Sequence, residues 1–115
     1  MEAQVCVEHD IALAQHFGWK DIEQADFGGI VGISPENGRM ENIPRPTENI
    51  EDKHKMVMAL LSEGVPFSIW LTPGGYYSAE FVFGLDSYTH KDKDYLHAVA
   101  GAAIKVINAR IKNGH

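Results

Sequence analysis

The stretch FSIWLTPGGYYSAEFVF, residues 67–83, decides the fold that the sequence predicts. From Phe67 to Thr72 large apolar side chains recur at every second position, which is typical of a strand with one buried face. Pro73, Gly74 and Gly75 follow, and they favour a turn because proline fixes φ and glycine accepts positive φ. A second strand is predicted over residues 76–83, so the stretch forms an antiparallel hairpin.

A second hairpin is predicted upstream. Residues 27–33 place Phe27, Val31 and Ile33 on one side at period two. The segment 34–39 then combines Pro35 with an Asn-Gly pair, which suits a chain reversal. A short return strand is expected over residues 40–43, ended by two prolines.

Helices are predicted on either side of each hairpin. The first ends at Phe17-Gly18, and its start has two alternatives. A start near Glu2 places Asp10 among apolar neighbours, whereas a start at Asp10 uses this carboxylate as the N-cap, which we favour. The last helix is predicted to be capped by Thr89 and to run to about Lys112.

Two of these helices carry clear apolar stripes. The helix that follows the cap Asn49 aligns Ile50, His54, Val57 and Leu61, and it ends at Gly64. The last helix has a stripe of small residues that favours close approach to a sheet, made of Tyr95, Ala98, Val99, Ala102, Ala103 and Val106.

The order of elements is α-β-β-α-β-β-α. It predicts an α+β fold in which an antiparallel sheet of about four strands packs with three helices. At 115 residues we expect a single sandwich domain over positions 1–115.

Several segments together carry a resemblance to a known family: Phe17-Gly18-Trp19-Lys20, the turn 34–39, Ile43-Pro44, Thr47–Ile50 and the alanine-rich run 98–104. This pattern resembles small phage and prophage proteins with an α-β-α (ABA) sandwich domain. The sequence departs from it in carrying His54 and Met56 in the second helix. The resemblance implies the fold and a viral or prophage origin. It transfers no functional residue, because none of these segments is a catalytic motif.

The composition limits the classes of partner. Sixteen acidic and ten basic residues give a formal charge of -6, which disfavours nucleic-acid binding and favours a basic partner. Cys6 is the single cysteine, so an intramolecular disulfide and a cysteine-rich zinc site are excluded. Without a recognisable leader or an apolar run of bilayer length, we expect a cytoplasmic protein that does not enter a membrane.

Histidines supply the metal hypothesis. His90, Asp94 and His97 are spaced four and three apart, so on the predicted last helix they share one side and suit a divalent metal. The favoured alternative is a solvated helix face, and we therefore predict no metal and no cofactor. His54 is interpreted as a core histidine rather than a buried catalytic base.

The remaining candidates concern binding. Cys6 has no basic residue or histidine beside it in sequence, so we interpret it as a packed side chain rather than a reactive thiolate. Arg39 and Arg45 flank the first hairpin and suit an anionic ligand, although solvated side chains are the simpler interpretation.

Aromatic side chains give the strongest binding hypothesis. If the residues around Trp70 alternate as predicted, Trp70, Tyr76 and Val82 lie on the sheet face opposite the core. An uncovered face of this kind predicts an interaction surface, whereas a helix covering it would make Trp70 a core residue.

The preferred function is a non-catalytic binding module, a small phage or prophage accessory protein that binds a host protein or a small ligand in the host cytoplasm. Counter-defence or host takeover is one version of this hypothesis. The alternatives are a small metal-dependent hydrolase using His90, Asp94 and His97, and a structural homodimer that pairs through sheet edges or the aromatic face.

Overall fold

The computed structural model describes residues 2–26 and 28–112, which form three helices and six strands in two separate antiparallel sheets of three strands each. The predicted α+β class is confirmed. The predicted single sheet of about four strands is wrong in strand number and in arrangement. Phe27, which opens one of the predicted strands, lies outside the described residues.

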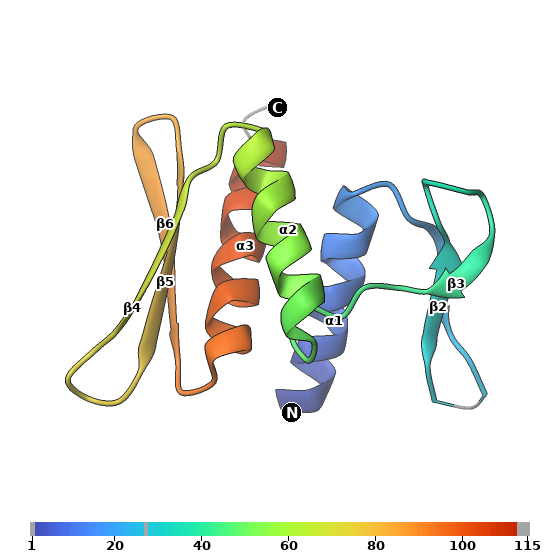
Figure 1. Cartoon of the computed structure of the whole chain (residues 1–115), viewed down its shortest axis with the longest axis horizontal. Helices are drawn as coiled ribbons and strands as arrows, with labels where there is room; N and C mark the ends of the chain where they lie inside the picture. The colour runs from blue at the N-terminus through green and yellow to red at the C-terminus, as the bar shows by residue number, and fades with distance from the viewer. Residues whose placement is uncertain (1, 27, 113–115) are drawn as a thin grey trace.

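Each sheet is a simple meander in which neighbouring strands follow one another along the chain (Figure 1). The elements in chain order are α1 (Glu2–His16), β1 (Lys20–Gln24), β2 (Ile30–Ile33), β3 (Met40–Asn42), α2 (Ile50–Ser62), β4 (Phe67–Leu71), β5 (Tyr77–Phe83), β6 (Asp86–Asp92) and α3 (Tyr95–Lys112). The hairpin predicted from residues 67–83 is confirmed, with Phe67 opposite Phe81 and Leu71 opposite Tyr77.

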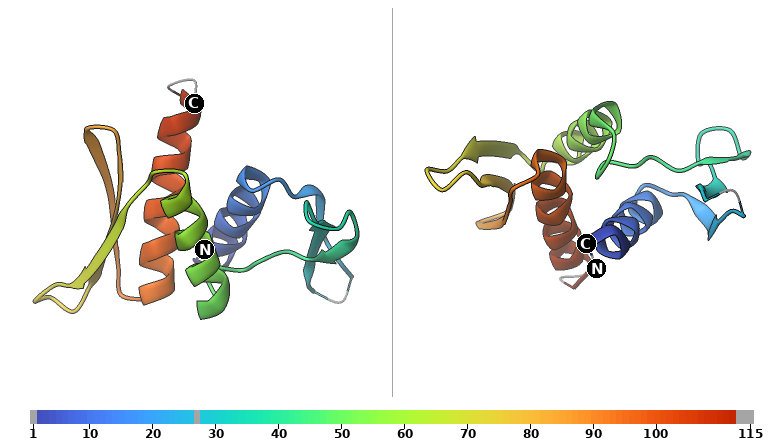
Figure 2. Two further views of the ribbon diagram at one scale, coloured as in Figure 1. Left: turned by 45° about the horizontal axis from the view of Figure 1, so that its top comes forward. Right: turned by 90° about the horizontal axis from the view of Figure 1, so that it is seen from below.

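The helices lie between the two sheets (Figures 1 and 2). The sheet β4–β5–β6 packs on α3, and α1 lies between α3 and the sheet β1–β2–β3. Within the described residues, no helix therefore covers the outward face of either sheet.

The main core lies between α3 and the sheet β4–β5–β6. The predicted stripe of small residues on α3 is confirmed, since Ala98, Val99, Ala102, Ala103 and Val106 are fully buried. These short side chains let Phe81 and Ala79 of β5 pack close to the helix backbone. A second, smaller core joins α1 to the sheet β1–β2–β3 through Ala14, Ile30 and Ile43.

The start of α3 differs from the prediction. Residues 86–92 form strand β6, and the helix begins at Tyr95. Thr89 and Asp92 have the spacing of a capping box. The residues 86–92 instead pair with β5 along the whole length of β6, so strand pairing is favoured over a helix there. Thr89 is therefore a strand residue and not an N-cap.

Helix α1 follows the alternative that we did not favour. It begins at Glu2, so Asp10 lies in its middle and is fully buried. The predicted capping role of Asp10 is wrong. Gly18 does close the helix region with φ of 98°, as the sequence predicted.

Helix α2 is capped by Asn49 as predicted, because the Asn49 side chain accepts a hydrogen bond from the Asp52 N–H at 3.0 Å. Its predicted buried stripe is wrong. Ile50 is 61% exposed, His54 is exposed and Leu61 is 48% exposed. The helix instead buries Lys53, Met56 and Leu60.

Candidate functional site

The predicted metal residues do not share a helix face. His90 lies in β6, Asp94 lies in the turn before α3, and His97 lies in the first turn of α3. His90 packs its ring over Gly101, where an added Cβ would lie 2.3 Å from His90 Cδ2. Within residues 2–26 and 28–112 no group of three histidine, cysteine or acidic side chains is arranged to hold a metal ion.

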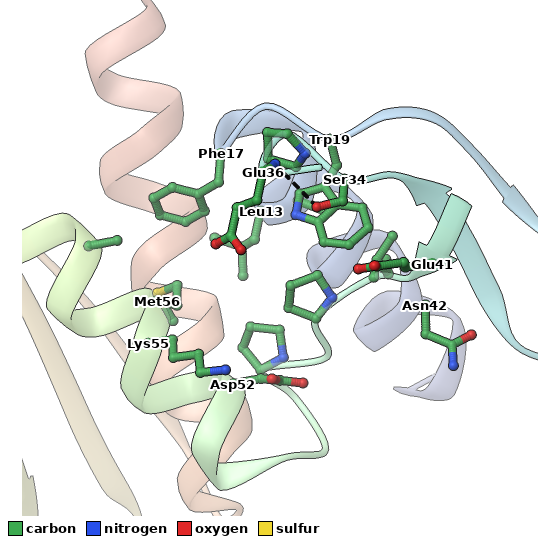
Figure 3. Close-up of a pocket in the computed structure, with 16 residues that line it drawn as sticks. Leu13, Phe17, Trp19, Ser34, Glu36, Glu41, Asn42, Asp52, Lys55 and Met56 are labelled. Carbon is green, nitrogen blue, oxygen red and sulfur yellow. Dashed lines mark hydrogen bonds between the residues drawn. The ribbon is translucent and has the colours of Figure 1, made fainter. Parts of the chain in front are cut away.

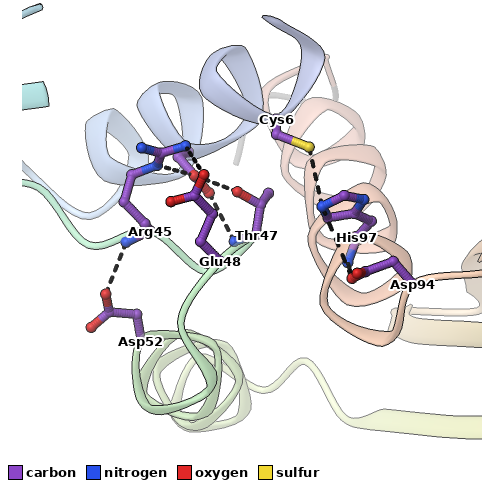
Figure 4. Close-up of polar contacts among 8 residues, drawn as sticks. Cys6, Arg45, Thr47, Glu48, Asp52, Asp94 and His97 are labelled. Carbon is purple, nitrogen blue, oxygen red and sulfur yellow. Dashed lines mark hydrogen bonds and ion pairs between the residues drawn. The ribbon is translucent and has the colours of Figure 1, made fainter. Parts of the chain in front are cut away.

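Cys6 has a histidine neighbour that sequence spacing does not reveal. His97 Nε2 lies 3.3 Å from Cys6 Sγ, although the two residues are 91 positions apart (Figure 4). The absence of a histidine beside Cys6 in sequence therefore does not hold in space, while the prediction of a packed Cys6 side chain is confirmed by its burial. Asp94 lies 3.9 Å from the same ring nitrogen and accepts a hydrogen bond from the His97 backbone N–H. In a nucleophilic triad the acid orients the opposite ring nitrogen, so Asp94 does not occupy the position of a triad acid.

Two further histidines lie near His97, namely His9 in α1 and His90 in β6. Burial lowers the pKa of His9 below its ordinary value of 6.5, against the opposing effect of Asp10 and Glu8. Burial also lowers the pKa of His90, and the positive charge of Lys105 acts in the same direction. Both groups are consequently held toward their neutral form in the folded chain.

Arg45 has its guanidinium engaged within the fold. Its Nε donates to the buried carboxylate of Asp10, and Asp10 also accepts hydrogen bonds from the Thr47 N–H at 3.1 Å and the Thr47 hydroxyl at 2.5 Å. Glu48 lies 3.3 Å from another nitrogen of Arg45 (Figure 4). This network ties the segment before α2 to the middle of α1. Arg39 is exposed in the turn between β2 and β3, so the two arginines do not have equivalent surroundings.

A groove is lined by residues of α1 and α2, of the β2–β3 turn and of the segment 41–46 (Figure 3). Its volume is about 570 Å³, within the range of small-molecule sites. The lining includes two half-buried aromatic residues, Phe17 and Trp19, and three prolines, Pro35, Pro44 and Pro46. Sequence analysis missed this groove because its lining residues come from four separate segments.

The predicted aromatic surface lies on the outward face of the sheet β4–β5–β6. Trp70 is 46% exposed and Tyr76 is 41% exposed, so no helix covers them. Val82 is half-buried. It lies on the same face of β5 as Ser78, the residue opposite Trp70, but four positions further along the strand. The neighbouring positions on this face are polar, and the Ser68 hydroxyl donates to Glu80 at 3.3 Å. Among the described strand residues of this face Trp70 is the one aromatic side chain, and Tyr76 lies directly before β5.

Strand β4 is one of the two edge strands of this sheet. The Val82 N–H donates to the Pro66 carbonyl and the Thr72 N–H donates to the Tyr76 carbonyl, which fixes the even-numbered residues as those bonded to β5. The backbone N–H and C=O groups of Phe67, Ile69 and Leu71 therefore point away from the sheet.

No family model, curated protein or solved structure matches this chain. In the part of the chain that the structure describes, none of the helices combines the length and apolar character needed to cross a membrane.

Proposed function

We propose that this chain is a small non-catalytic binding module that captures an extended segment of a protein partner along the open edge of β4. The observation that carries the proposal is an edge strand without a charged side chain, in which three N–H and three C=O groups point away from the sheet and have no pairing partner among the described residues. A segment that adds as a fourth strand satisfies these groups by β-augmentation.

The comparison with the other described edge strands supports this choice. Each of them carries charge: Lys20, Asp21 and Glu23 in β1, Glu41 in β3, and Asp86, Lys91 and Asp92 in β6. Charged residues on an edge discourage pairing with another chain. β4 reads Phe-Ser-Ile-Trp-Leu and keeps an unbroken register with β5, so it lacks both charge and a bulge.

The surroundings of β4 add apolar contact area for such a partner. Leu71 is 62% exposed at the end of the strand. Phe67 and Ile69 of β4 and Val57 of α2 are partly buried at the margin of the main core. Val57 belongs to the predicted stripe on α2 that proves to be exposed at Ile50 and Leu61. A strand added to β4 can therefore place its alternate side chains against this margin.

The biological setting of the proposal rests on the resemblance given above. We propose a phage or prophage accessory protein that binds a host protein in the host cytoplasm, with counter-defence or host takeover as its role. The net charge of -6 favours a basic partner through long-range attraction.

Amide hydrogen exchange tests the edge directly. Short random peptides are selected for binding to the chain, and exchange is then measured with and without a selected peptide. We expect the amides of Phe67, Ile69 and Leu71 to exchange fast in the free chain and slowly in the complex, while those of Ser68 and Trp70 are slow in both. Unchanged exchange at the three outward amides in a saturated complex refutes the proposal.

A matched pair of variants provides the control. Leu71→Lys and Ser87→Lys each add one positive charge at an exposed position, at opposite edges of the same sheet. We expect Leu71→Lys to weaken peptide binding at least about tenfold, since a charge on an edge opposes pairing. Ser87→Lys should leave binding unchanged. Light scattering at twice the 12.8 kDa chain mass, with the same amides protected without peptide, instead shows that a second copy pairs with β4.

A further inference from the structure

We infer that the groove between α1, α2 and the β2–β3 turn binds a small organic cation with an apolar body, such as an aromatic amine or amidine. This site goes beyond the proposed function, because none of its lining residues belongs to β4 or to the sheet of β4.

The charge around the groove selects the sign of the ligand. Glu36, Glu41 and Asp52 line it together with a single basic residue, Lys55, as Figure 3 shows. These three carboxylates come from the β2–β3 turn, from β3 and from α2, so they approach the opening from different elements. The excess of two negative charges, three acidic less one basic, attracts a cation.

Each carboxylate keeps capacity to accept a further hydrogen bond. Glu36 makes no side-chain hydrogen bond or ion pair with the described residues. One oxygen of Glu41 accepts from the Asn37 side-chain amide at 2.7 Å, and one oxygen of Asp52 accepts from the Arg45 N–H at 2.9 Å. The second oxygen of each of these two groups remains available to a cationic donor.

The apolar part of the lining selects the body of the ligand. Phe17 and Trp19 are half-buried, and Leu13 and Met56 lie beneath them as buried residues. An aromatic face beside a carboxylate favours a cation over a neutral or anionic group, because the ring quadrupole adds to the carboxylate attraction. A volume of about 570 Å³ accommodates a ring with a charged substituent rather than a folded protein element.

The two tryptophans make the site measurable with an internal control. Trp19 lines the groove, whereas Trp70 lies on the outward face of the other sheet. Benzamidine, benzamide and benzoate share a ring and differ in charge, so each is titrated separately while the two indole N–H resonances are followed by NMR. We expect benzamidine to shift the Trp19 resonance in a saturable manner and to leave Trp70 unchanged. Benzoate should have no effect.

Variants test the role of charge. Glu36→Gln combined with Glu41→Gln should weaken benzamidine binding roughly tenfold, since each exposed carboxylate contributes a modest attraction. The control variant Glu51→Gln with Glu23→Gln also removes two negative charges, but at exposed positions outside the groove, and it should leave the affinity for benzamidine unchanged. High salt should weaken binding to the unmodified chain.

Three outcomes overturn the inference. They are equal responses to benzamidine and benzoate, no shift of Trp19 at saturating concentrations of any probe, and equal losses in the two double variants. An arginine-rich peptide that binds the groove at least about tenfold tighter than benzamidine overturns the choice of a small molecule. Failure of peptide capture at β4 has no bearing on these measurements, because they report on Trp19.

Discussion

Asp10→Ala should destabilise the fold more than the loss of a surface ion pair does, because Asp10 is fully buried in the middle of α1. Its carboxylate accepts hydrogen bonds from the Arg45 guanidinium, the Thr47 N–H and the Thr47 hydroxyl. Thr47 is itself buried, so removing the carboxylate leaves two donors without a partner and without water.

The magnitude follows from these contacts. Each buried donor that loses its partner costs about 1–3 kcal/mol, and breaking a buried ion pair from one side costs about 3–5 kcal/mol. Glu48 remains as a second acid beside Arg45, so the positive charge of the guanidinium keeps one partner of opposite charge when Asp10 is removed. We therefore expect a loss of about 3–5 kcal/mol, a large share of the roughly 5–15 kcal/mol that stabilises a typical domain.

Urea unfolding followed by circular dichroism measures this change in the free energy of unfolding. Glu48→Gln is the control, because its carboxylate pairs with the same arginine but is 63% exposed, and we expect it to cost at most about 1 kcal/mol. Thr47→Val should cost about 1 kcal/mol, since it removes one hydroxyl donor and preserves the side-chain shape. If Asp10→Ala is too unstable to measure, Asp10→Asn is compared with the same controls. An Asp10 variant no less stable than Glu48→Gln refutes the reasoning.

Three further predictions concern packing and pH. Gly101→Ala should destabilise the chain by at least about 1 kcal/mol in thermal unfolding, because the new Cβ collides with the His90 ring, although alanine favours helices. In a His90→Ala background the same substitution should be neutral or stabilising. Burial lowers the folded-state pKa of His9 and of His90, so below pH 6.5 the unfolded chain binds more protons and the free energy of unfolding should fall. Urea midpoints at neutral and mildly acidic pH measure this fall, and a His9→Gln, His90→Gln double variant should reduce it. Leu60→Ala should cost about 2–5 kcal/mol in urea unfolding, whereas Leu61→Ala should cost less than about 1 kcal/mol, and equal costs contradict the rotation of α2 seen here.

Local chemistry predicts the elements of this fold well where the signal comes from neighbouring residues. The strand and hairpin over 67–83, the Asn49 cap and the alanine stripe of α3 all depend on side chains within a few positions, and all are confirmed, although Leu71 at the end of β4 is exposed. Strand β6 is not predicted, because its inward positions are Tyr88, His90 and Asp92 and therefore give no alternation of apolar and polar residues.

The candidate sites depend on contacts between distant segments, which a single sequence does not encode in its spacing. Asp10 meets Thr47 across 37 positions and Cys6 meets His97 across 91 positions. The first contact explains why a helix accommodates a carboxylate in its buried face, since the partner comes from the segment before α2. No pattern within α1 distinguishes this role from that of an N-cap.

The orientation of α2 connects the two proposed binding regions. The periodic stripe of Ile50, Val57 and Leu61 suggests a buried face, yet Ile50 and Leu61 are exposed and Val57 is partly buried against the main core. Its buried side carries Lys53, whose Nζ donates to the Tyr95 hydroxyl at 3.0 Å, together with Met56 and Leu60. A third side presents Asp52 and Lys55 to the groove. Because Ile50 and Leu61 remain exposed, α2 keeps apolar surface that folding does not use, and this surface is compatible with the binding function proposed above.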